Sequence, residues 1–553
     1  MKNERSIWND IVPAPASVSV DEAFAVPIPR RITVAAESAE LAAGIIEIVE
    51  LSLGEFDDSG SVDRGDAAVP DAGRGISVMP VQDGGERAAL IAELESGSAA
   101  VPDPAADVTQ CSDERWTLSC HIDDATNAAA FRIRAAGYRG AMRAAAALAQ
   151  AIGRAVRLSR ADRAGASLPS AELAGVPRYP WRGFMLDCVR HMFPVALVTR
   201  LIDQAALHGL NVFHWHLSDD QGWRLPSEAY PVLEKVAAWR DDNTTHYGSY
   251  GGVYSASEIR DVVEHAARRG IVVVPEIDVP GHVSSVLAAM PELSCTGKAG
   301  PVPIRHGIFE DVLCAGNPDA HRFLKTVFSE LCELFPGPFI HLGGDECPST
   351  RWEACPKCRA RAEELGLSDV ALLHGDLVCT AVQTIEAHDR RAVGWDEVLE
   401  SDPPQGVLVM CWRAHECAER AIAAGHDVIL CPTDRACYFD HKPLDDPREP
   451  GWLGVCTIRD TYRFRPVRDT VDAPSVSANE SGGPAVLGSQ GNLWTEQIRF
   501  GREAEYMLWP RLAALAEVLW GTAGRGEGDE ERILRHASWL RSIDIKSYDG
   551  PAG

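Results

Sequence analysis

Two adjacent carboxylates, Asp345 and Glu346, follow the segment His341-Leu342-Gly343-Gly344. In a regular strand, neighbouring side chains point to opposite faces. The two glycines loosen the backbone, so both carboxyls could address one site. Paired carboxyls shielded from water take different pKa values, which leaves one ionised and one protonated near neutral pH. Glycoside cleavage requires that division, because it uses an acid for the leaving oxygen and an anion for the developing positive charge.

An Asp-Glu pair taken alone is commonly just a solvated pair at the start of a loop. Chemistry is favoured here because seven other apolar runs also end in polar or aromatic residues. These residues are Asp187 and Arg190, Asp219 and Asp220, Asp278 and His282, Trp395 and Asp396, Trp412, Tyr438 and Asp440, and Trp494 and Glu496. If the runs are parallel strands of one barrel, their carboxyl ends meet at one mouth and the side chains converge there.

Three tryptophans at strand ends, Trp395, Trp412 and Trp494, offer flat apolar walls that suit the C–H faces of a sugar and an acetamido methyl group. Core packing is the alternative for any one of them. Three at the same end of different strands favour a ligand cage. The charged residues expected to bind sugar hydroxyls there are Arg190, Asp219, Asp440 and Glu496.

Two further groups leave alternatives open. Asp278 and His282 could form a carboxylate–imidazole pair that orients the acid, or His282 could be a structural histidine with satisfied hydrogen bonds. The run Cys355-Pro356-Lys357-Cys358, near Cys347, has the spacing of a zinc half-site. A second half-site is not evident in the sequence, so we expect neither a metal nor a cofactor.

The elements that must position these residues alternate between apolar runs and helical patterns from Pro177 onward. Repeated strand–helix units favour an α/β fold with a (β/α)₈ barrel. A doubly wound open sheet is the alternative, but no Gly-rich dinucleotide turn follows the first strand. Ser255 and Glu258 predict a capping box, and Asn317 with Pro318 predicts another helix start. The eight predicted strands are 183–187, 211–217, 271–274, 339–342, 392–395, 407–412, 428–430 and 486–493.

We expect two domains: a smaller α+β accessory domain over residues 1–175 and the barrel with C-terminal helices over 176–553. The first has extended-looking runs at 45–53, 116–122 and 131–134 and an Ala-rich helical stretch at about 137–152. Residues 56–75 are acidic and Gly-rich, which is typical of a mobile loop. We find no chemical motif in this domain.

The overall composition excludes some functions. Of 553 residues, 53 are basic and 80 acidic, and the net charge of −27 argues against nucleic-acid binding. No run of about eighteen apolar residues occurs, so we expect no membrane span. The first ten residues lack the apolar core of a secretory signal. The odd number of cysteines, 15, does not indicate a disulfide framework. We therefore expect a cytoplasmic protein.

Long motifs over about residues 177–520 resemble the barrel of the family-20 glycoside hydrolases, the β-N-acetylhexosaminidases. The first 175 residues resemble that family's accessory domain only in placement and in the helix-bearing end. The motifs, in order, are Pro180-Trp181-Arg182-Gly183, His214-Trp215-His216-Leu217-Ser218-Asp219-Asp220-Gln221-Gly222-Trp223-Arg224, Val274-Pro275-Glu276-Ile277-Asp278 with Pro280-Gly281-His282, Gly343-Gly344-Asp345-Glu346, Gly394-Trp395-Asp396-Glu397, Tyr438-Phe439-Asp440 and Asn492-Leu493-Trp494-Thr495-Glu496.

The resemblance implies hydrolysis of terminal non-reducing GlcNAc or GalNAc from β-glycosides by a substrate-assisted, retaining mechanism. The substrate's acetamido oxygen attacks the anomeric carbon and gives an oxazolinium intermediate. By this resemblance Glu346 protonates the glycosidic oxygen and later activates water. Asp345 orients the acetamido group, and Tyr438 hydrogen-bonds its carbonyl oxygen. The residues that would hold the terminal sugar, and so make the enzyme exo-acting, are Arg190, Asp440 and Glu496.

Two rival functions remain. A non-catalytic sugar-binding protein on the same barrel would lack the acid, whereas Glu346 is present. A metal-dependent hydrolase would use the carboxylates and His282 as ligands, and retained activity in EDTA would exclude it. Cys295 and Cys314 lie where some secreted relatives of the family carry a disulfide, but in a reducing cytoplasm they would stay thiols.

Overall fold

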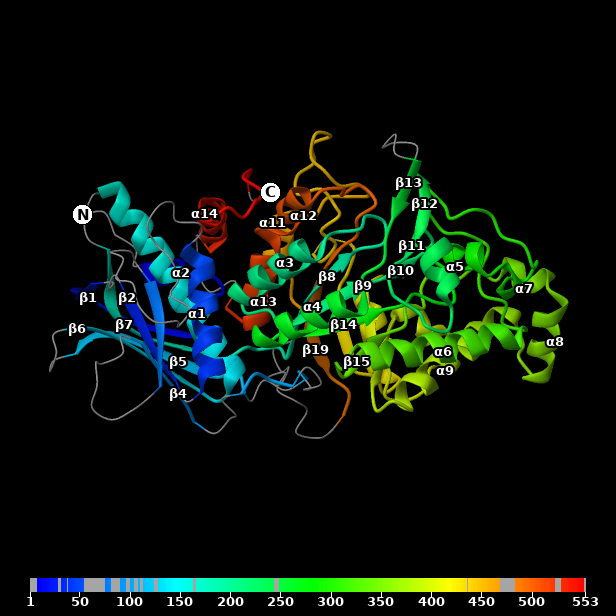
Figure 1. Cartoon of the computed structure of the whole chain (residues 1–553), viewed down its shortest axis with the longest axis horizontal. Helices are drawn as coiled ribbons and strands as arrows, with labels where there is room; N and C mark the ends of the chain where they lie inside the picture. Colours follow the sequence, from blue (N-terminus) through cyan, green and yellow to red (C-terminus); the bar gives the residue numbers. More distant parts are fainter. Residues whose placement is uncertain are drawn as a thin grey trace.

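The computed structural model contains a seven-stranded sheet with two long helices, followed by a closed eight-stranded barrel (Figure 1). Among the described residues, no helix is long and apolar enough to cross a bilayer. The residues that the structure describes are 7–27, 31–36, 38–53, 75–80, 90–95, 100–103, 108–109, 113–123, 128–162, 166–242, 248–434, 436–467, 483–522 and 529–551.

The first sheet has the strand order β1-β7-β5-β6-β4-β2-β3. Its β1-β7-β5-β6 part is antiparallel, and its β6-β4-β2-β3 part is parallel. Helices α1 (Ala39–Leu53) and α2 (Tyr138–Asp162) pack on each other and lie between this sheet and the barrel (Figure 1). The strands are β1 (Ser17–Pro27), β2 (Arg31–Ala36), β3 (Gly75–Pro80), β4 (Leu90–Leu94), β5 (Trp116–Asp123), β6 (Ala128–Ala135) and β7 (Ser167–Gly175).

One element of this first region differs from the sequence prediction. Residues 45–53 were expected to be extended, because the run is rich in isoleucine and valine. They belong to α1, since Leu41, Ile45, Ile48 and Val49 recur at helical spacing and are all buried. The other two predicted extended runs and the Ala-rich helix are confirmed as β5, β6 and α2. Of the predicted loop 56–75, all but the last residue lies outside the described residues.

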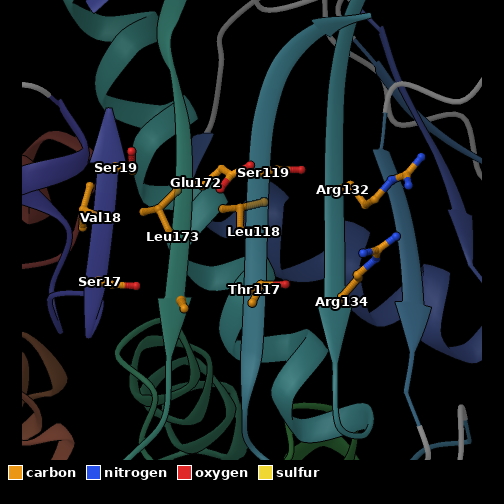
Figure 2. A pocket seen from close by; sticks show the side chains of 11 residues that line it. Ser17, Val18, Ser19, Thr117, Leu118, Ser119, Arg132, Arg134, Glu172 and Leu173 are labelled. Carbon is orange, nitrogen blue, oxygen red and sulfur yellow. The ribbon is translucent and has the colours of Figure 1, made fainter. Parts of the chain in front are cut away.

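The outer face of this sheet carries a shallow depression of about 420 Å³ between β1, β7, β5 and β6. Figure 2 shows its side chains projecting from the strands, including Arg132 and Arg134 of β6 and Glu172 of β7. Arg134 is paired with Glu93 at 3.0 Å, and both side chains are largely exposed. None of the residues expected to do chemistry lines this depression.

The barrel closes through parallel pairing in the order β14-β15-β16-β17-β18-β19-β8-β9. All eight predicted strands are present, so the predicted (β/α)₈ fold is confirmed. An open doubly wound sheet is excluded because β19 pairs with β8 and leaves no edge. The strands are β8 (Trp181–Asp187), β9 (Val212–His216), β14 (Val272–Glu276), β15 (Phe339–His341), β16 (Arg391–Trp395), β17 (Leu408–Cys411), β18 (Val428–Leu430) and β19 (Val486–Leu493).

Local sequence signals set the helix boundaries around the barrel. Ser255 and Glu258 form the predicted capping box of α4, and Asn317 accepts a hydrogen bond from the Asp319 backbone at the start of α6. The helices are α3 (Val195–Leu207), α4 (Ala256–Arg268), α5 (Ser284–Ala289), α6 (Pro318–Leu334), α7 (Thr350–Ala354), α8 (Pro356–Glu364), α9 (Leu373–Glu386), α10 (His415–Ala423), α11 (Ile458–Arg463), α12 (Gly501–Leu508), α13 (Arg511–Trp520) and α14 (Asp529–Ser542).

A buried ionic cluster joins the first region to the amino ends of the barrel strands. Glu114, just before β5, accepts hydrogen bonds from Arg143 of α2 and from Arg182 of β8. Asn211, which precedes β9, donates to the other carboxylate oxygen of Glu114 at 3.2 Å. Arg143 also donates to the Gly270 carbonyl at 3.0 Å. Charged and polar groups therefore fix α2 on the barrel.

Candidate active site

The backbone after β15 turns so that two successive acids face the same way. Gly343 and Gly344 have φ values of 73° and 101°, and Glu346 itself has a φ of 46°. These left-handed conformations are strained for residues other than glycine. A Cβ atom at Gly343 would lie 1.8 Å from Oδ1 of Asp278, so no larger residue fits there. The local strain breaks the strand alternation and brings Asp345 and Glu346 to one side.

Both acids face the imidazole of His282, in the loop after β14. Nε2 of His282 lies 3.4 Å from Oε2 of Glu346 and 3.9 Å from Oδ2 of Asp345. On the other side of the ring, Nδ1 lies 3.0 Å from Oδ2 of Asp220 and 3.4 Å from Oδ1 of Asp219. His282 therefore bridges the acids and the aspartates that follow β9.

The carboxylate partner of His282 differs from the predicted one. The sequence left open whether Asp278 pairs with this histidine, and the hydrogen bond at Nδ1 is with Asp220. Asp278 lies beneath the glycine turn instead, where its Oδ1 accepts the Gly344 backbone N–H at 3.3 Å. The backbone N–H of Asp278 donates to the hydroxyl oxygen of Ser218. The close approach of Gly343 fixes this position, and the Asp278 carboxylate still lies within 4.8 Å of the His282 ring.

The charge states at this site follow from burial and crowding. Burial, reinforced by Glu346, raises the pKa of Asp345 to about 6, although His282 opposes the shift. Burial and then Asp345 raise the pKa of Asp278 well above its ordinary value. Burial alone would lower the pKa of His282, but Asp219 and Asp220 outweigh it and raise that pKa well above its ordinary value. Of the two acids that follow the turn, the Asp345 side chain is 12% exposed and that of Glu346 33%.

Arg190, in the loop after β8, is surrounded by carboxylates. Its Nη2 lies 2.6 Å from Asp219 and 4.0 Å from Glu496, and its Nη1 lies 3.3 Å from Asp187. Its guanidinium lies over the Trp494 ring, 5.0 Å from the centroid. The guanidinium is thus held in one orientation by contacts on several sides.

Asp219 does not fit its predicted role as a residue that binds substrate. Its Oδ2 contacts Arg190 and lies 3.0 Å from Nε2 of His216, and its Oδ1 accepts the Asp220 backbone N–H. The residue is 1% exposed. Because both oxygens are occupied by protein groups, Asp219 orients Arg190 and His282 instead.

Three acceptor oxygens at the mouth have no partner. Among the described residues, Oδ1 of Asp345, Oδ1 of Asp440 and Oε2 of Glu496 are buried without a hydrogen bond. Burial, with Glu496 nearby, raises the pKa of Asp440 well above its ordinary value. Burial also raises the pKa of Glu496, even though Arg190 opposes it. Unpaired buried polar atoms are costly, so these oxygens indicate where donors of a ligand would bind.

The aromatic residues gather at the same end of the barrel. Trp395 and Trp494 lie 6.0 Å apart between ring centroids, and Trp412 stacks on Tyr438 at 6.2 Å. Trp412 and Trp494 are partly exposed, whereas Trp395 is fully buried. Tyr438 bridges to Asn492 of β19 and is only 8% exposed. The three indoles thus line the mouth of the barrel, with Trp412 and Trp494 partly accessible and Trp395 buried.

Sequence reasoning missed two acids that support these walls. Glu276 ends β14 fully buried, and its two carboxylate oxygens contact three histidines, among them His214 and His341 at 3.1 and 2.9 Å. Trp395 donates its indole N–H to the same carboxylate. Glu397 accepts the Trp412 indole N–H at 2.9 Å, and burial and then Asp345 raise its pKa to about 9. Glu276 could have been recognised from the sequence, because a single acid at the end of an otherwise apolar strand predicts a buried carboxylate with polar partners.

One group of side chains at the mouth could offer ligands to a metal ion, but its contacts favour hydrogen bonding. His282, Asp345 and Glu346 bring their ligand atoms within 4.8 Å of one another. A metal-bound histidine must be neutral at the ligating nitrogen. Asp219 and Asp220 raise the pKa of His282, and Nδ1 of the ring already contacts Asp220 at 3.0 Å, which favours a hydrogen-bonding role. A different group of four cysteines lies outside this site.

Comparisons with known proteins agree with this geometry. A sequence model described as "Glycosyl hydrolase family 20, catalytic domain" matches residues 179–523. A β-hexosaminidase of Porphyromonas gingivalis is 36% identical over 355 residues, which are 64% of this chain and 44% of that protein. A β-hexosaminidase of Vibrio furnissii is 35% identical over 396 residues, 70% of this chain and 62% of that protein. The matched part thus spans less than two thirds of either relative.

Solved structures resemble the chain over nearly its whole length. The GH20 exo-β-N-acetylglucosaminidase of Vibrio harveyi, solved in complex with N-acetylglucosamine, is 27% identical with a TM-score of 0.78 and covers 99% of this chain and 80% of its own. The Streptomyces plicatus N-acetyl-β-hexosaminidase, in complex with Thio-NAglucal, is 26% identical with a TM-score of 0.76. The match covers 98% of this chain and 97% of the Streptomyces chain. Since the family match includes every strand of the barrel, the chain belongs to glycosyl hydrolase family 20.

Proposed function

We propose that the protein is an exo-acting β-N-acetylhexosaminidase that removes terminal non-reducing GlcNAc or GalNAc from β-glycosides by a substrate-assisted, retaining mechanism. One observation carries the proposal. Asp345 and Glu346 lie on the same side of the barrel mouth, facing one imidazole nitrogen, and the buried Asp345 retains an unpartnered oxygen.

The shared orientation argues against a protein nucleophile. In glycosidases with two catalytic carboxyls, the groups flank the scissile bond and stand about 5 Å or more apart. Asp345 and Glu346 are sequence neighbours, and their nearest oxygens both lie within 4.8 Å of each other and of His282. Asp345 is therefore placed beside the acid, where it would accept the acetamido N–H. The substrate's own carbonyl oxygen would then attack the anomeric carbon.

Glu346 is proposed as the general acid and later the base. It is the more exposed of the two acids, so a leaving group or a water molecule could reach it. When it gives its proton to the glycosidic oxygen it becomes an anion 3.4 Å from Nε2 of His282, whose pKa the neighbouring aspartates raise. Asp220 holds the far nitrogen of that ring at 3.0 Å. His282 and Asp220 would thus stabilise the carboxylate and position it for the second step.

Tyr438 and the tryptophans are proposed to enclose the acetamido group. Burial raises the pKa of Tyr438 well above its ordinary value, so its hydroxyl keeps the proton and could donate it to the acetamido carbonyl oxygen. Polarising that oxygen in a fixed direction favours the closed, five-membered intermediate. Trp412, stacked on Tyr438, and Trp395 with Trp494 would cover the methyl group and the sugar face.

The exo mode is proposed from the charged residues around Arg190. The unpartnered oxygens of Asp440 and Glu496 are acceptors, and Arg190 is a donor fixed by Asp187 and Asp219. Together they would bind several hydroxyls of one sugar ring through charge-assisted hydrogen bonds. A chain extended from those hydroxyls would lose these contacts, which restricts binding to a terminal residue.

The expected partners follow from this chemistry. We propose an oligosaccharide with a terminal N-acetylhexosamine, such as a chitin-derived disaccharide, as the substrate, and neither nucleic acid nor a membrane. We also propose a cytoplasmic location, because the fourteen described cysteines are all unpaired and a reducing compartment keeps thiols free. The solved Vibrio harveyi relative was crystallised with N-acetylglucosamine, which supports the substrate class.

Hydrolysis of matched nitrophenyl β-glycosides, with and without the 2-acetamido group, tests the proposal directly. We expect cleavage of the acetamido sugar only, and strong inhibition by a thiazoline that mimics the oxazolinium ion. Equal cleavage of both glycosides, or indifference to the thiazoline, would argue for a protein nucleophile. Binding of the acetamido sugar without any turnover would favour a sugar-binding protein.

A further inference from the structure

Four cysteines outside the active site bring their sulfur atoms together. Sγ of Cys358 lies 3.7 Å from that of Cys295 and 3.6 Å from that of Cys314, and Cys314 lies 3.8 Å from Cys355. All four sulfurs lie within 4.8 Å of one another. We propose that this four-cysteine cluster (Cys295, Cys314, Cys355 and Cys358) is a structural zinc site.

The sulfur–sulfur distances match a tetrahedral thiolate site. Four sulfurs at about 2.3 Å from a zinc ion form a tetrahedron whose edges are about 3.8 Å long. The three closest pairs in the cluster lie between 3.6 and 3.8 Å. A disulfide would require about 2.05 Å. Each of two sulfurs, those of Cys314 and Cys358, also has two close sulfur neighbours, whereas a disulfide pairs each sulfur with one.

The first half-site is the sequence Cys355-Pro356-Lys357-Cys358 at the start of α8. Cys355 is the N-cap residue, so the spacing of three places Cys358 in the first turn of the helix. The backbone N–H of Gly316 points at the Cys358 sulfur, 3.4 Å away. A Cβ atom at Gly316 would lie 2.2 Å from the Lys357 carbonyl, so only glycine permits this approach.

The second half-site is formed by two segments that are distant in sequence. Ser294 and Leu313 make an isolated antiparallel bridge, and the Cys314 backbone N–H donates to the Leu293 carbonyl at 2.9 Å. This bridge sets Cys295 and Cys314 side by side. The family resemblance had associated Cys295 with Cys314 only as the site of a disulfide in some relatives, because no short metal-binding motif joins them in the sequence.

The donor set selects the metal and its role. Four thiolates favour zinc over the oxygen-preferring cations. With four protein ligands no coordination position is left for water or substrate, so the ion would be structural and not catalytic. Binding would replace the thiol protons, which are released to solvent. Three of the four cysteines are buried and Cys295 is partly buried, as expected for a closed site.

The zinc ion would hold together the two loops that carry the acid and its histidine. Cys347 directly follows Glu346, and α7 and α8 continue that loop to Cys355 and Cys358. From the other loop, the Leu313 backbone N–H donates to the Pro280 carbonyl at 3.1 Å, two residues before His282. The Trp352 indole N–H donates to the Leu313 carbonyl at 2.8 Å and links both loops.

Metal analysis of the untagged full chain, purified with a reductant and without a chelator, tests the proposal. We expect one zinc per chain by plasma mass spectrometry, either as purified or after incubation with zinc and removal of excess. Replacement by cobalt should give the visible absorption of a tetrahedral cobalt thiolate. Chains that take up no zinc under reducing conditions, or an intact mass showing disulfides within the cluster, would overturn the proposal. Neither result depends on the glycosidase activity.

Single substitutions assign the bound ion to the cluster. We expect Cys358→Ser to abolish stoichiometric zinc binding and Cys295→Ser, at the most exposed ligand, to speed zinc release to a competing chelator at least about tenfold, since each lost thiolate weakens the site. Cys379→Ser, at a partly exposed cysteine of α9 outside the cluster, is the matched control and should retain the wild-type zinc content and release rate. Equal zinc loss in Cys379→Ser, or wild-type release from Cys295→Ser, would contradict the assignment.

Discussion

Acidic side chains are buried at both ends of the barrel, but at the carboxyl ends of the strands three of them keep an oxygen without a partner among the described residues. At the amino ends of the strands, both oxygens of Glu114 are engaged by Arg143, Arg182 and Asn211. Burial alone would raise the pKa of Glu114, but the two arginines outweigh it and lower the pKa to about 2. This carboxylate is therefore ionised at all physiological pH values, with no capacity left for a ligand.

At the carboxyl ends of the strands, three buried acids lack a hydrogen-bond partner for one oxygen within the part of the chain that the structure describes. Asp345, Asp440 and Glu496 each keep an oxygen without a partner among the described residues, and burial raises the pKa of all three. A paired buried charge holds a structure together, whereas an unpaired one raises the energy of the folded state. The comparison thus separates acids that serve the fold from acids reserved for a ligand, on physical grounds alone.

Glu346→Gln should produce the largest effect. Because the amide cannot donate a proton to the glycosidic oxygen, we expect kcat for an N-acetylhexosamine disaccharide to fall by about 10²–10⁴-fold. Ligand affinity should stay near wild type, and a nitrophenyl glycoside, whose leaving group needs less protonation, should lose less. Steady-state kinetics with both substrates measures this. Glu353→Gln, at an exposed position on α7, is the control, and equal losses in the two variants would remove Glu346 as the acid.

Asp345→Asn should lower turnover by about 10²–10³-fold, because it removes a charge directed at the developing positive charge. The same change should raise the melting temperature, since the raised pKa of Asp345 shows that its anion is unfavourable in the folded state. In the wild type, kcat/KM should fall as the pH drops through about 6, because the anion becomes protonated. If Asp345→Asn were slower but no more stable than the wild type, the result would argue against an unpaired Asp345 that is kept for the ligand.

Asp440→Ala should reduce kcat/KM by about 10–100-fold, the loss expected when a charge-assisted hydrogen bond to a sugar hydroxyl is removed. An analogue that lacks that hydroxyl should then be cleaved at the same rate by the wild type and by Asp440→Ala. Measuring kcat/KM of both proteins with both substrates tests this. Asp434→Ala, at an exposed position of the same segment, should behave as wild type. Retained discrimination between the two substrates in Asp440→Ala would place Asp440 outside the sugar site.

The sequence predicted the barrel and the convergence at its mouth because both depend on local, repeated signals. Each β strand is a short apolar run with its polar residues at the carboxyl end, so Asp345, His282 and Trp395 could be assigned to one site before the structure was known. Residues 45–53 were misassigned because β-branched residues favour strands, while the burial against α2 that decides in favour of a helix is tertiary.

Pairings between loops were beyond the reach of sequence reasoning. Asp278 and Asp220 both lie near His282 in this barrel, and the glycine turn against Asp278 leaves Asp220 to bond the imidazole. The second half of the cysteine cluster depends in the same way on the bridge between Ser294 and Leu313. Such contacts join residues whose distance along the chain carries no information about their distance in space.

Glu114→Gln tests the paired end of the comparison. Removing one member of a buried ion pair leaves the arginines uncompensated, so we expect a loss of about 3–5 kcal/mol in unfolding free energy. Denaturant unfolding at pH 7 measures it. Because Glu114 lies at the amino ends of the strands, kcat and KM of the folded variant should match wild type. A large loss of activity without a loss of stability would mean that this end of the barrel also serves catalysis.

The pH dependence of this loss provides the control. Since the folded pKa of Glu114 is lowered to about 2 from its ordinary value of 4.5, its stabilising contribution is fully present above pH 4.5 and disappears as the pH falls toward 2. The difference between wild type and Glu114→Gln should therefore narrow over that range. Glu95→Gln, which breaks an exposed pair with Arg115, should cost less than about 1 kcal/mol at any pH. If both variants lost equal stability at pH 7, burial and pairing would not distinguish the two carboxylates.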